Sequence, residues 1–314
     1  RDYYASRGLG DVYKRQHMLD RIERIDKPLM YTKPPKIKLE YDIEPTKDIV
    51  RVVDCPLVVG EGADKKELIK SLTMNVRRGE HVAIIGANGI GKTSILKLIQ
   101  GIIPHEGGNI SWGGNVKISY FEQEHAILDP HKTVLEEIMD RYPRLSEQQA
   151  RSVLGAVLLT GENVFKPISV LSGGERAKLC FAIMALNRGN VLVLDEPTNH
   201  LDLSTKEVLE DALAEFGGTI ILVSHDRYLL NKVASRIIEI KHDEVNSYEG
   251  NFDAYSEAVN AASQLKMQSE AEIKRAEEEK AYKENKARQY RSKEQRAADA
   301  QKRNRIRELE KEIE

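Results

Sequence analysis

The strongest chemical signal in the sequence is a glycine-rich stretch that ends in a lysine. Residues 86–93 are GANGIGKT, which fits the pattern G-x-x-x-x-G-K-(Ser/Thr) and stands between an apolar run and a helix-like run. Glycines let backbone N–H groups wrap phosphate oxygens, the Lys92 ammonium adds charge near β and γ phosphates, and the Thr93 hydroxyl can ligate Mg²⁺. A glycine turn that only closes a strand is the alternative, but the flanking patterns favour a phosphate-binding loop. We expect contacts to a nucleoside triphosphate from Gly86, Asn88, Gly89, Gly91, Lys92, Thr93 and Ser94.

Two adjacent carboxylates follow a second apolar run. Residues 191–196 are VLVLDE, so Asp195 and Glu196 stand where a strand ends, the edge at which α/β sheets place their ligands. Because neighbouring side chains on a strand point in different directions, the two can have separate roles. Asp195 suits Mg²⁺ bound through water, and Glu196 suits a water that attacks the γ-phosphate. Acidic residues often end strands, so this pair alone is a weak signal.

Three further motifs strengthen the prediction. In LSGGE, residues 171–175, Ser172 and the N–H groups of Gly173 and Gly174 are placed to bind an anion at a helix start, although an ordinary capped helix has the same residues. His225 follows another apolar run, and as a lone residue it would more often be structural. Gln123 follows the strand-like VKISYF and is placed to reach the metal.

Short apolar runs and helix-like segments predict the elements that position these residues. Continuous apolar runs are typical of strands buried on both faces of a parallel sheet. Ser146, with Gln149 three residues later, is a capping-box pattern that starts a helix. We therefore expect an α/β fold with a helical insert. The strand-like segments are residues 49–53, 72–76, 81–86, 191–195 and 219–224, and the helix-like segments are 94–99, 133–139 and 146–159.

The two ends of the chain differ from this core. We interpret residues 1–16 as an adapter-derived artefact, because DVYKRQ at 11–16 resembles a translated sequencing adapter; a natural polar tail is the alternative. Residues 17–48 contain a helix-like end and then four prolines, which is typical of a linker. We place one domain at 49–250. Residues 251–314 contain neither glycine nor proline, which predicts a long, partly coiled-coil helix; it ends in mid-pattern, so we expect the natural protein to continue.

The C-terminal helix carries a concentration of positive charge. Residues 281–307 hold ten basic and three acidic side chains. Such a density suits a nucleic-acid phosphate backbone. A solvated coiled-coil arm has the same appearance, and the sequence leaves both interpretations open.

Composition limits the remaining classes of protein. Across 314 residues, 48 basic and 50 acidic side chains nearly cancel. The two cysteines lack metal-ligand spacing, which argues against a disulfide framework or a zinc site. No apolar run approaches the length of a membrane span, and no signal peptide is recognisable. We expect a cytoplasmic protein without a membrane span.

The order of GANGIGKT, Gln123, LSGGE, VLVLDE, PTNHLD and His225 resembles the ATP-binding cassette ATPases over residues 49–240. DEPTNHLD, SHDRYLL and KISYFEQE resemble in particular the F type, soluble twin-cassette proteins that act on ribosomes. The resemblance implies a P-loop NTPase fold with an antiparallel β part, and ATP and Mg²⁺ as ligands. It implies that Lys92 and Thr93 bind phosphate and Mg²⁺, that Gln123 and Asp195 serve the metal, that Glu196 drives hydrolysis and that His225 contacts the γ-phosphate.

The same resemblance implies a partner. In this family LSGGE completes the site of the opposite cassette, so we expect pairing with a second cassette, in cis in the full-length protein or as a homodimer. Residues 17–48 would then be the end of an inter-cassette linker, and the domain at 49–250 the second cassette. Residues 57–60 lack the aromatic that usually stacks on adenine, which leaves ATP versus GTP preference open.

Three functions remain to be compared. The leading hypothesis is an ATPase whose cassette closure is coupled to the ribosome, through ribosomal RNA or tRNA. Its role would be that of a translation factor or of ribosome protection, including antibiotic resistance, and the sequence leaves this choice open. The second is the nucleotide-binding subunit of a membrane transporter, which the linker, PTNHLD and the charged tail disfavour. The third is a non-enzymatic DNA- or RNA-binding scaffold regulated by ATP.

Overall fold

The computed structural model describes residues 36–60, 65–122, 128–199, 201–242 and 244–313. The chain divides into two compact units. The first unit contains the residues up to 49 together with 112–219, and the second unit contains 50–111 and 220–314. Each unit is therefore built from two segments that are distant in the sequence.

The second unit contains a sheet with β3 (His81–Gly86) inside it. β3 pairs in parallel with β7 (Thr219–Val223) and with β8 (Arg236–Ile240), and β8 pairs antiparallel with β9 (Val245–Glu249). β7 and β8 are buried along their whole length, and α2 (Lys92–Ile99) packs on β3. The prediction of buried strands at 81–86 and 219–224 is confirmed. β8 and β9 were not anticipated from the sequence.

A three-stranded sheet has the order β2-β1-β4. It consists of β1 (Asp48–Val59), β2 (Lys66–Arg77) and β4 (Asn109–Trp112). Much of β2 alternates between buried and exposed residues, so one face points to the core.

The first unit combines a parallel strand pair with the helical insert. β5 (Ile118–Glu122) pairs with β6 (Val191–Asp195), and α5 (Gly173–Asn187) packs on β5. The insert consists of α3 (Val134–Arg141) and α4 (Glu147–Ala156), which contact each other, and two short 3-10 helices, η2 (Gly161–Phe165) and η3 (Ile168–Val170). Ser146 and Gln149 form the capping box that the sequence predicts. α4 ends three residues before the predicted boundary, and Leu158 has a left-handed φ of 63°.

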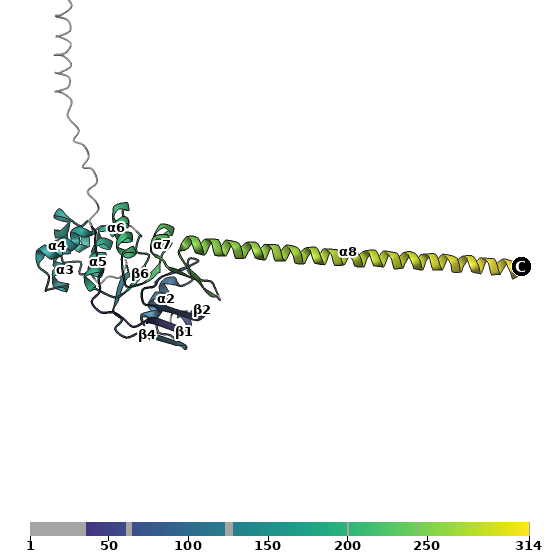
Figure 1. Ribbon diagram of the computed structural model, residues 1–314, viewed down its shortest axis with the longest axis horizontal. Coiled ribbons are helices and arrows are strands. Elements are labelled where there is room, and N and C mark those ends of the chain that lie inside the picture. Colours follow the sequence, from purple (N-terminus) through teal and green to yellow (C-terminus); the bar gives the residue numbers. More distant parts are fainter. Residues whose placement is uncertain (1–35, 61–64, 123–127, 200, 243, 314) are drawn as a thin grey trace, which may run out of the picture. The chain divides into compact units, whose positions relative to one another are not determined.

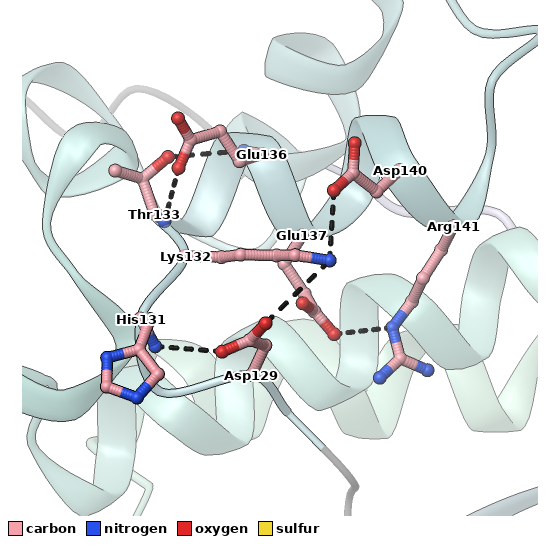
Figure 2. A network of polar contacts seen from close by, with 8 residues as sticks. All are labelled: Asp129, His131, Lys132, Thr133, Glu136, Glu137, Asp140 and Arg141. Atoms are coloured by element: carbon pink, nitrogen blue, oxygen red, sulfur yellow. Dashed lines mark hydrogen bonds and ion pairs between the residues drawn. The ribbon is translucent and has the colours of Figure 1, made fainter.

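A polar network fastens the segment before α3 to that helix (Figure 2). The Lys132 ammonium lies 2.9 Å from Asp140 and 4.0 Å from Asp129, and the hydrogen bond to Asp140 raises the pKa of Lys132. The buried Glu137 carboxylate accepts a hydrogen bond from Arg141 Nε at 2.6 Å. Thr133 and Glu136 form a further capping box. The insert is thus fixed immediately after residues 123–127, which lie outside the described part of the chain.

Three further helices lie in the described part of the chain. They are α6 (Leu203–Ala214), α7 (Arg227–Val233) and α8 (Phe252–Ile313). α8 is a single helix of 62 residues, as predicted for the tail (Figure 1). Among the described residues no helix has the length and apolar character needed to cross a membrane. The fold class is confirmed as mixed α/β, with parallel strands, antiparallel strands and a helical insert.

Candidate nucleotide-binding elements

The loop between β3 and α2 depends on glycine at defined positions. Gly89 and Gly91 have φ values of 78° and 104°, a region that other residues rarely adopt. A Cβ on Gly91 would lie 2.8 Å from Leu68 Cδ1 and 2.9 Å from Leu57 Cδ2. A Cβ on Gly86 would lie 2.6 Å from the Ile240 carbonyl oxygen. Close packing excludes a side chain at Gly86, backbone conformation disfavours one at Gly89, and both reasons apply at Gly91.

Lys92 lies against the backbone of the same loop. Its ammonium donates hydrogen bonds to the carbonyl oxygens of Gly86, at 3.0 Å, and Ala87, at 3.1 Å, and the residue is only 8% exposed. Gly91 is the N-cap of α2, and no side chain caps this helix. A helix start without a side-chain cap is the arrangement in which backbone N–H groups suit an anion. Thr93 is exposed in the first turn, where its hydroxyl is the oxygen ligand that Mg²⁺ prefers. The loop fits a magnesium triphosphate.

His225 stands beside this loop in the second unit. It follows β7, and the next residue, Asp226, caps α7 by accepting hydrogen bonds from the N–H groups of Tyr228 and Leu229. His225 is exposed, and together with Gly86 and Ala87 it lines a cleft of about 690 Å³. The structure thus brings together two motifs that are well over a hundred residues apart in the sequence.

The LSGGE segment starts α5 in the first unit, and its side chains cap that helix. Ser172 Oγ accepts a hydrogen bond from Glu175 N at 3.2 Å and donates one to Glu175 Oε2 at 2.9 Å. The Ser172 N–H also donates to Glu175 Oε2, at 2.9 Å, and Lys166 Nζ lies 3.1 Å from Glu175 Oε1. These hydrogen bonds, the one from the Ser172 backbone above all, hold the pKa of Glu175 below its usual range. The Ser172 hydroxyl is therefore already engaged, while Gly173 and Gly174 supply the first two N–H groups of α5.

The paired carboxylates stand at the end of β6, also in the first unit. Asp195 and Glu196 are both partly exposed. Glu196 has a φ of 46°, a left-handed conformation that costs a residue with a side chain roughly 1–2 kcal/mol. Such strain gathers at functional sites, which agrees with the role expected of Glu196.

Asp202, at the end of PTNHLD, joins α6 to α5. Its carboxylate caps α6 and lies 2.8 Å from Lys178 Nζ on α5. Burial alone would raise the pKa of Asp202, but the hydrogen bonds from Lys178 and from Ser204 and Thr205 outweigh it and depress that pKa well below its usual range. The loop after Glu196 is thereby fixed to the helix that LSGGE starts.

The predicted site residues therefore fall into two groups. The second unit holds the loop from Gly86 to Ser94 and His225, and the first unit holds Ser172, Gly173, Gly174, Asp195 and Glu196. Gln123 lies outside the described residues. Sequence reasoning missed Leu57, Leu68 and Ile240, which make the glycines necessary. No local signal could have revealed them, since each comes from a distant segment.

Comparison with known proteins identifies the domain. Residues 69–199 match the family model described as ABC transporter. The chain is 38% identical over 258 residues to the ATP-binding protein YdiF of Bacillus subtilis, covering 82% of this chain and 40% of that protein. It is 36% identical over 262 residues to ABC transporter F family member 5 of Arabidopsis thaliana, covering 83% and 37%. This chain carries an ATP-binding cassette of the F type.

The cassette is also similar to a third relative and to a solved structure. It is 39% identical over 206 residues to the energy-dependent translational throttle protein EttA of Mycobacterium tuberculosis, covering 63% of this chain and 37% of that protein. A solved dimer of the ATP-binding cassette MJ0796, in a post-hydrolysis state with ADP and Pi, is 24% identical with a TM-score of 0.55; it covers 64% of this chain and 98% of that one. At this identity the structure supports the fold alone. The chain spans about two fifths of the length of the curated relatives named here.

Proposed function

We propose that this cassette binds ATP with Mg²⁺ and hydrolyses it at the β–γ phosphoanhydride. The observation that carries the proposal is the loop before α2, where glycine geometry, the position of Lys92 and an uncapped helix start all suit a triphosphate. The nucleotide contacts come from Gly86, Asn88, Gly89, Gly91, Lys92, Thr93 and Ser94.

Each remaining residue has a proposed role. Thr93, Asp195 and Gln123 would hold Mg²⁺, which would supply positive charge to the triphosphate. Glu196 accepts a hydrogen bond from the attacking water and draws its proton away from the oxygen that attacks. His225 donates a hydrogen bond to the γ-phosphate, where negative charge grows during transfer.

We further propose that the active form contains two cassettes. Ser172, Gly173 and Gly174 would contact the nucleotide of the opposite cassette, supplied in cis in a longer protein or by a second copy of this chain. The solved cassette that shares this fold is described as dimeric, and the pairing of this chain is our proposal. Hydrolysis per molecule should then rise with protein concentration.

The cellular role that we propose is a cytoplasmic translation factor whose cassette closure is coupled to the ribosome, through ribosomal RNA or tRNA. Similarity to a protein named as a translational throttle supports it. The basic part of α8 supports it as well, since Lys302, Arg303 and Arg307 are exposed. An exposed basic helix suits phosphate backbones.

Co-sedimentation tests this role. With a non-hydrolysable ATP analogue the chain should pellet with ribosomes and not with lipid vesicles, and phosphate release should depend on ATP. Pelleting with vesicles alone would favour the transporter subunit. RNA binding should weaken with salt, with a log–log slope of about −4 to −5 if about half of the ten basic residues at 283–307 engage. A chain cut after Asn260 should lose this binding and keep its ATP affinity; equal binding by both chains would make α8 a solvated arm.

A further inference from the structure

The first turn of α8, residues 252–255, which we call its root, is in contact with the segment that carries His225. Arg227 follows His225 by two residues, and its guanidinium carbon lies 5.4 Å from the centre of the Phe252 ring. Phe252 is the first residue of α8. A cation this close to an aromatic face is attracted by the ring quadrupole, so the contact is specific for a cation and a ring.

A second link joins α7 to the same turn of α8. Asn231 Nδ2 donates to Asp253 Oδ1 at 2.9 Å, and the Asp253 N–H donates to Asn231 Oδ1 at 2.9 Å. α7 begins at Arg227, directly after the His225 turn. The start of α8 is therefore held by a side chain of the helix that the His225 turn begins.

A third link joins α8 to β8, beside the phosphate-binding loop. Glu239, only 7% exposed, accepts hydrogen bonds from Tyr255 OH at 2.8 Å and from Tyr248 OH at 3.3 Å, and lies 2.9 Å from Lys241 Nζ. Burial raises the pKa of Tyr255, and so does its bond to Glu239, so this phenol stays a donor at neutral pH. The next residue, Ile240, has the carbonyl against which Gly86 packs.

One cleft is lined by residues of the first and third of these links. Gly86, Ala87, His225, Arg227, Phe252 and Tyr255 all line the cleft of about 690 Å³. The phosphate-binding loop, the His225 turn and the root of α8 therefore line the same cleft. Only one residue separates His225 from Arg227, so a shift of the His225 turn would move the backbone that carries the Arg227 contact with Phe252.

We propose that Arg227 and Phe252 are positioning residues for His225, and that through their contact the nucleotide site and α8 influence each other. The proposal rests on the hydrolytic role given to His225 above. Because coupling between two sites is reciprocal, nucleotide binding should order the root of α8, and weakening that root should disturb His225.

Steady-state hydrolysis by the full chain tests the first direction. Arg227→Gln and Phe252→Leu should each lower kcat about three- to tenfold, the range of coupling effects without ligand contact, while ATP affinity stays unchanged. The double variant should be no slower than the slower single variant, since both remove one contact. Arg227→Lys and Phe252→Tyr keep cation and ring and should retain kcat. Additive losses, or a parallel loss of affinity, would overturn the proposal.

The chain offers a matched control. Arg151 lies 4.8 Å from the centre of the Phe165 ring in the first unit, a pair of the same chemistry outside the proposed machinery. Arg151→Gln and Phe165→Leu should leave kcat unchanged. An equal loss of kcat in this pair would mean that general destabilisation explains the Arg227 and Phe252 variants.

Hydrogen exchange tests the second direction without hydrolysis. A non-hydrolysable ATP analogue with Mg²⁺ should slow exchange of the amides at 253–257 about threefold or more in the unsubstituted chain, and should not in Phe252→Leu or Arg227→Gln. Equal slowing in all three chains, or slowing in none, would overturn the coupling. If the unsubstituted chain releases no phosphate yet shows this difference, the proposed ATPase activity fails while the coupling stands.

Discussion

The two glycine-containing helix starts of this cassette differ in how they are capped: α5 has a side-chain cap and α2 has none. At α2, Gly91 is the N-cap, no side chain caps the helix and its first turn contains no acidic residue. At α5, Ser172 and Glu175 cap the helix reciprocally, and Lys166 supports the Glu175 carboxylate. Both segments are predicted to bind phosphate, yet only α5 has a side-chain cap at its start.

The difference bears on the roles proposed for the two segments, a primary phosphate site and a conditional one. Backbone N–H groups at a helix start without a side-chain cap suit an anion, so we expect the backbone of α2 to contribute to affinity. At the start of α5 the Ser172 hydroxyl already accepts the N–H of Glu175. To contact the phosphate of a partner cassette, Ser172 must exchange its bond to Glu175 for a new one. We therefore expect the start of α5 to contact phosphate only when two cassettes pair, and not in a single cassette.

The largest expected effect separates turnover from binding. Glu196→Gln should lower kcat by about 10²- to 10⁴-fold, because it removes the carboxylate proposed to activate water, and should leave ATP affinity unchanged. Lys92→Ala should instead weaken ATP binding about 10- to 100-fold, the usual cost of a lost charge-assisted hydrogen bond. Phosphate release and equilibrium binding measure the two.

A full hydrolysis rate in Glu196→Gln would show that its role is misassigned. Unchanged affinity in Lys92→Ala would contradict the phosphate-binding loop, and with it the difference between the two helix starts.

The next effect tests the backbone of the α2 start. Gly91→Ala should weaken ATP binding at least about tenfold, because a Cβ meets Leu68 and Leu57 below 3.0 Å and the left-handed φ adds roughly 1–2 kcal/mol. Gly79→Ala is the matched control, with a φ of 78° and no atom within 4 Å of its Cβ. It should lower the unfolding free energy similarly through strain while ATP affinity stays unchanged. Equal affinity losses would mean that stability, and not loop shape, governs binding.

A smaller effect is expected from the α5 cap. Ser172→Ala should cost about 1 kcal/mol of unfolding free energy, the usual value of a lost N-cap, and leave ATP binding to the dilute chain unchanged. Ser146→Ala removes the equivalent cap of α4 and should cost about the same. Only Ser172→Ala should also lower hydrolysis at high protein concentration, where cassettes pair. Identical kinetics of the two variants would make Ser172 a cap and nothing more.

The smallest effect concerns pH. Since the pKa of Glu175 is lowered in the folded chain, its stabilising contribution is complete above the unfolded pKa of about 4.3 and is lost as pH falls below that value. Glu175→Gln should therefore remove less than about 1 kcal/mol of acid-dependent stability, measured by urea unfolding at pH 7 and below pH 4. The first turn of α2 has no such carboxylate. If the loop before α2 lost stability at acid pH to the same extent in the absence of ATP, the difference between the two helix starts would be contradicted.

Much of the site could be predicted because its chemistry lies in consecutive residues. GANGIGKT places glycines, lysine and threonine on one turn, and the capping box at Ser146 and Gln149 is complete within four residues. The apolar runs that became β3, β6 and β7 were recognisable because burial on both faces requires unbroken apolar sequence. The roles of Asp195, Glu196 and Gln123 remain predictions.

The sequence by itself determined the cassette, its phosphate-binding loop and the long helical tail, since each depends on neighbours along the chain. Only the tertiary structure decided that Gly86 packs on Ile240, that Gly91 packs on Leu57 and Leu68, and that Arg227 meets Phe252. Those contacts join residues tens to more than a hundred and fifty positions apart. No local pattern encodes them, because they depend on which strands and helices pack side by side once the core has formed.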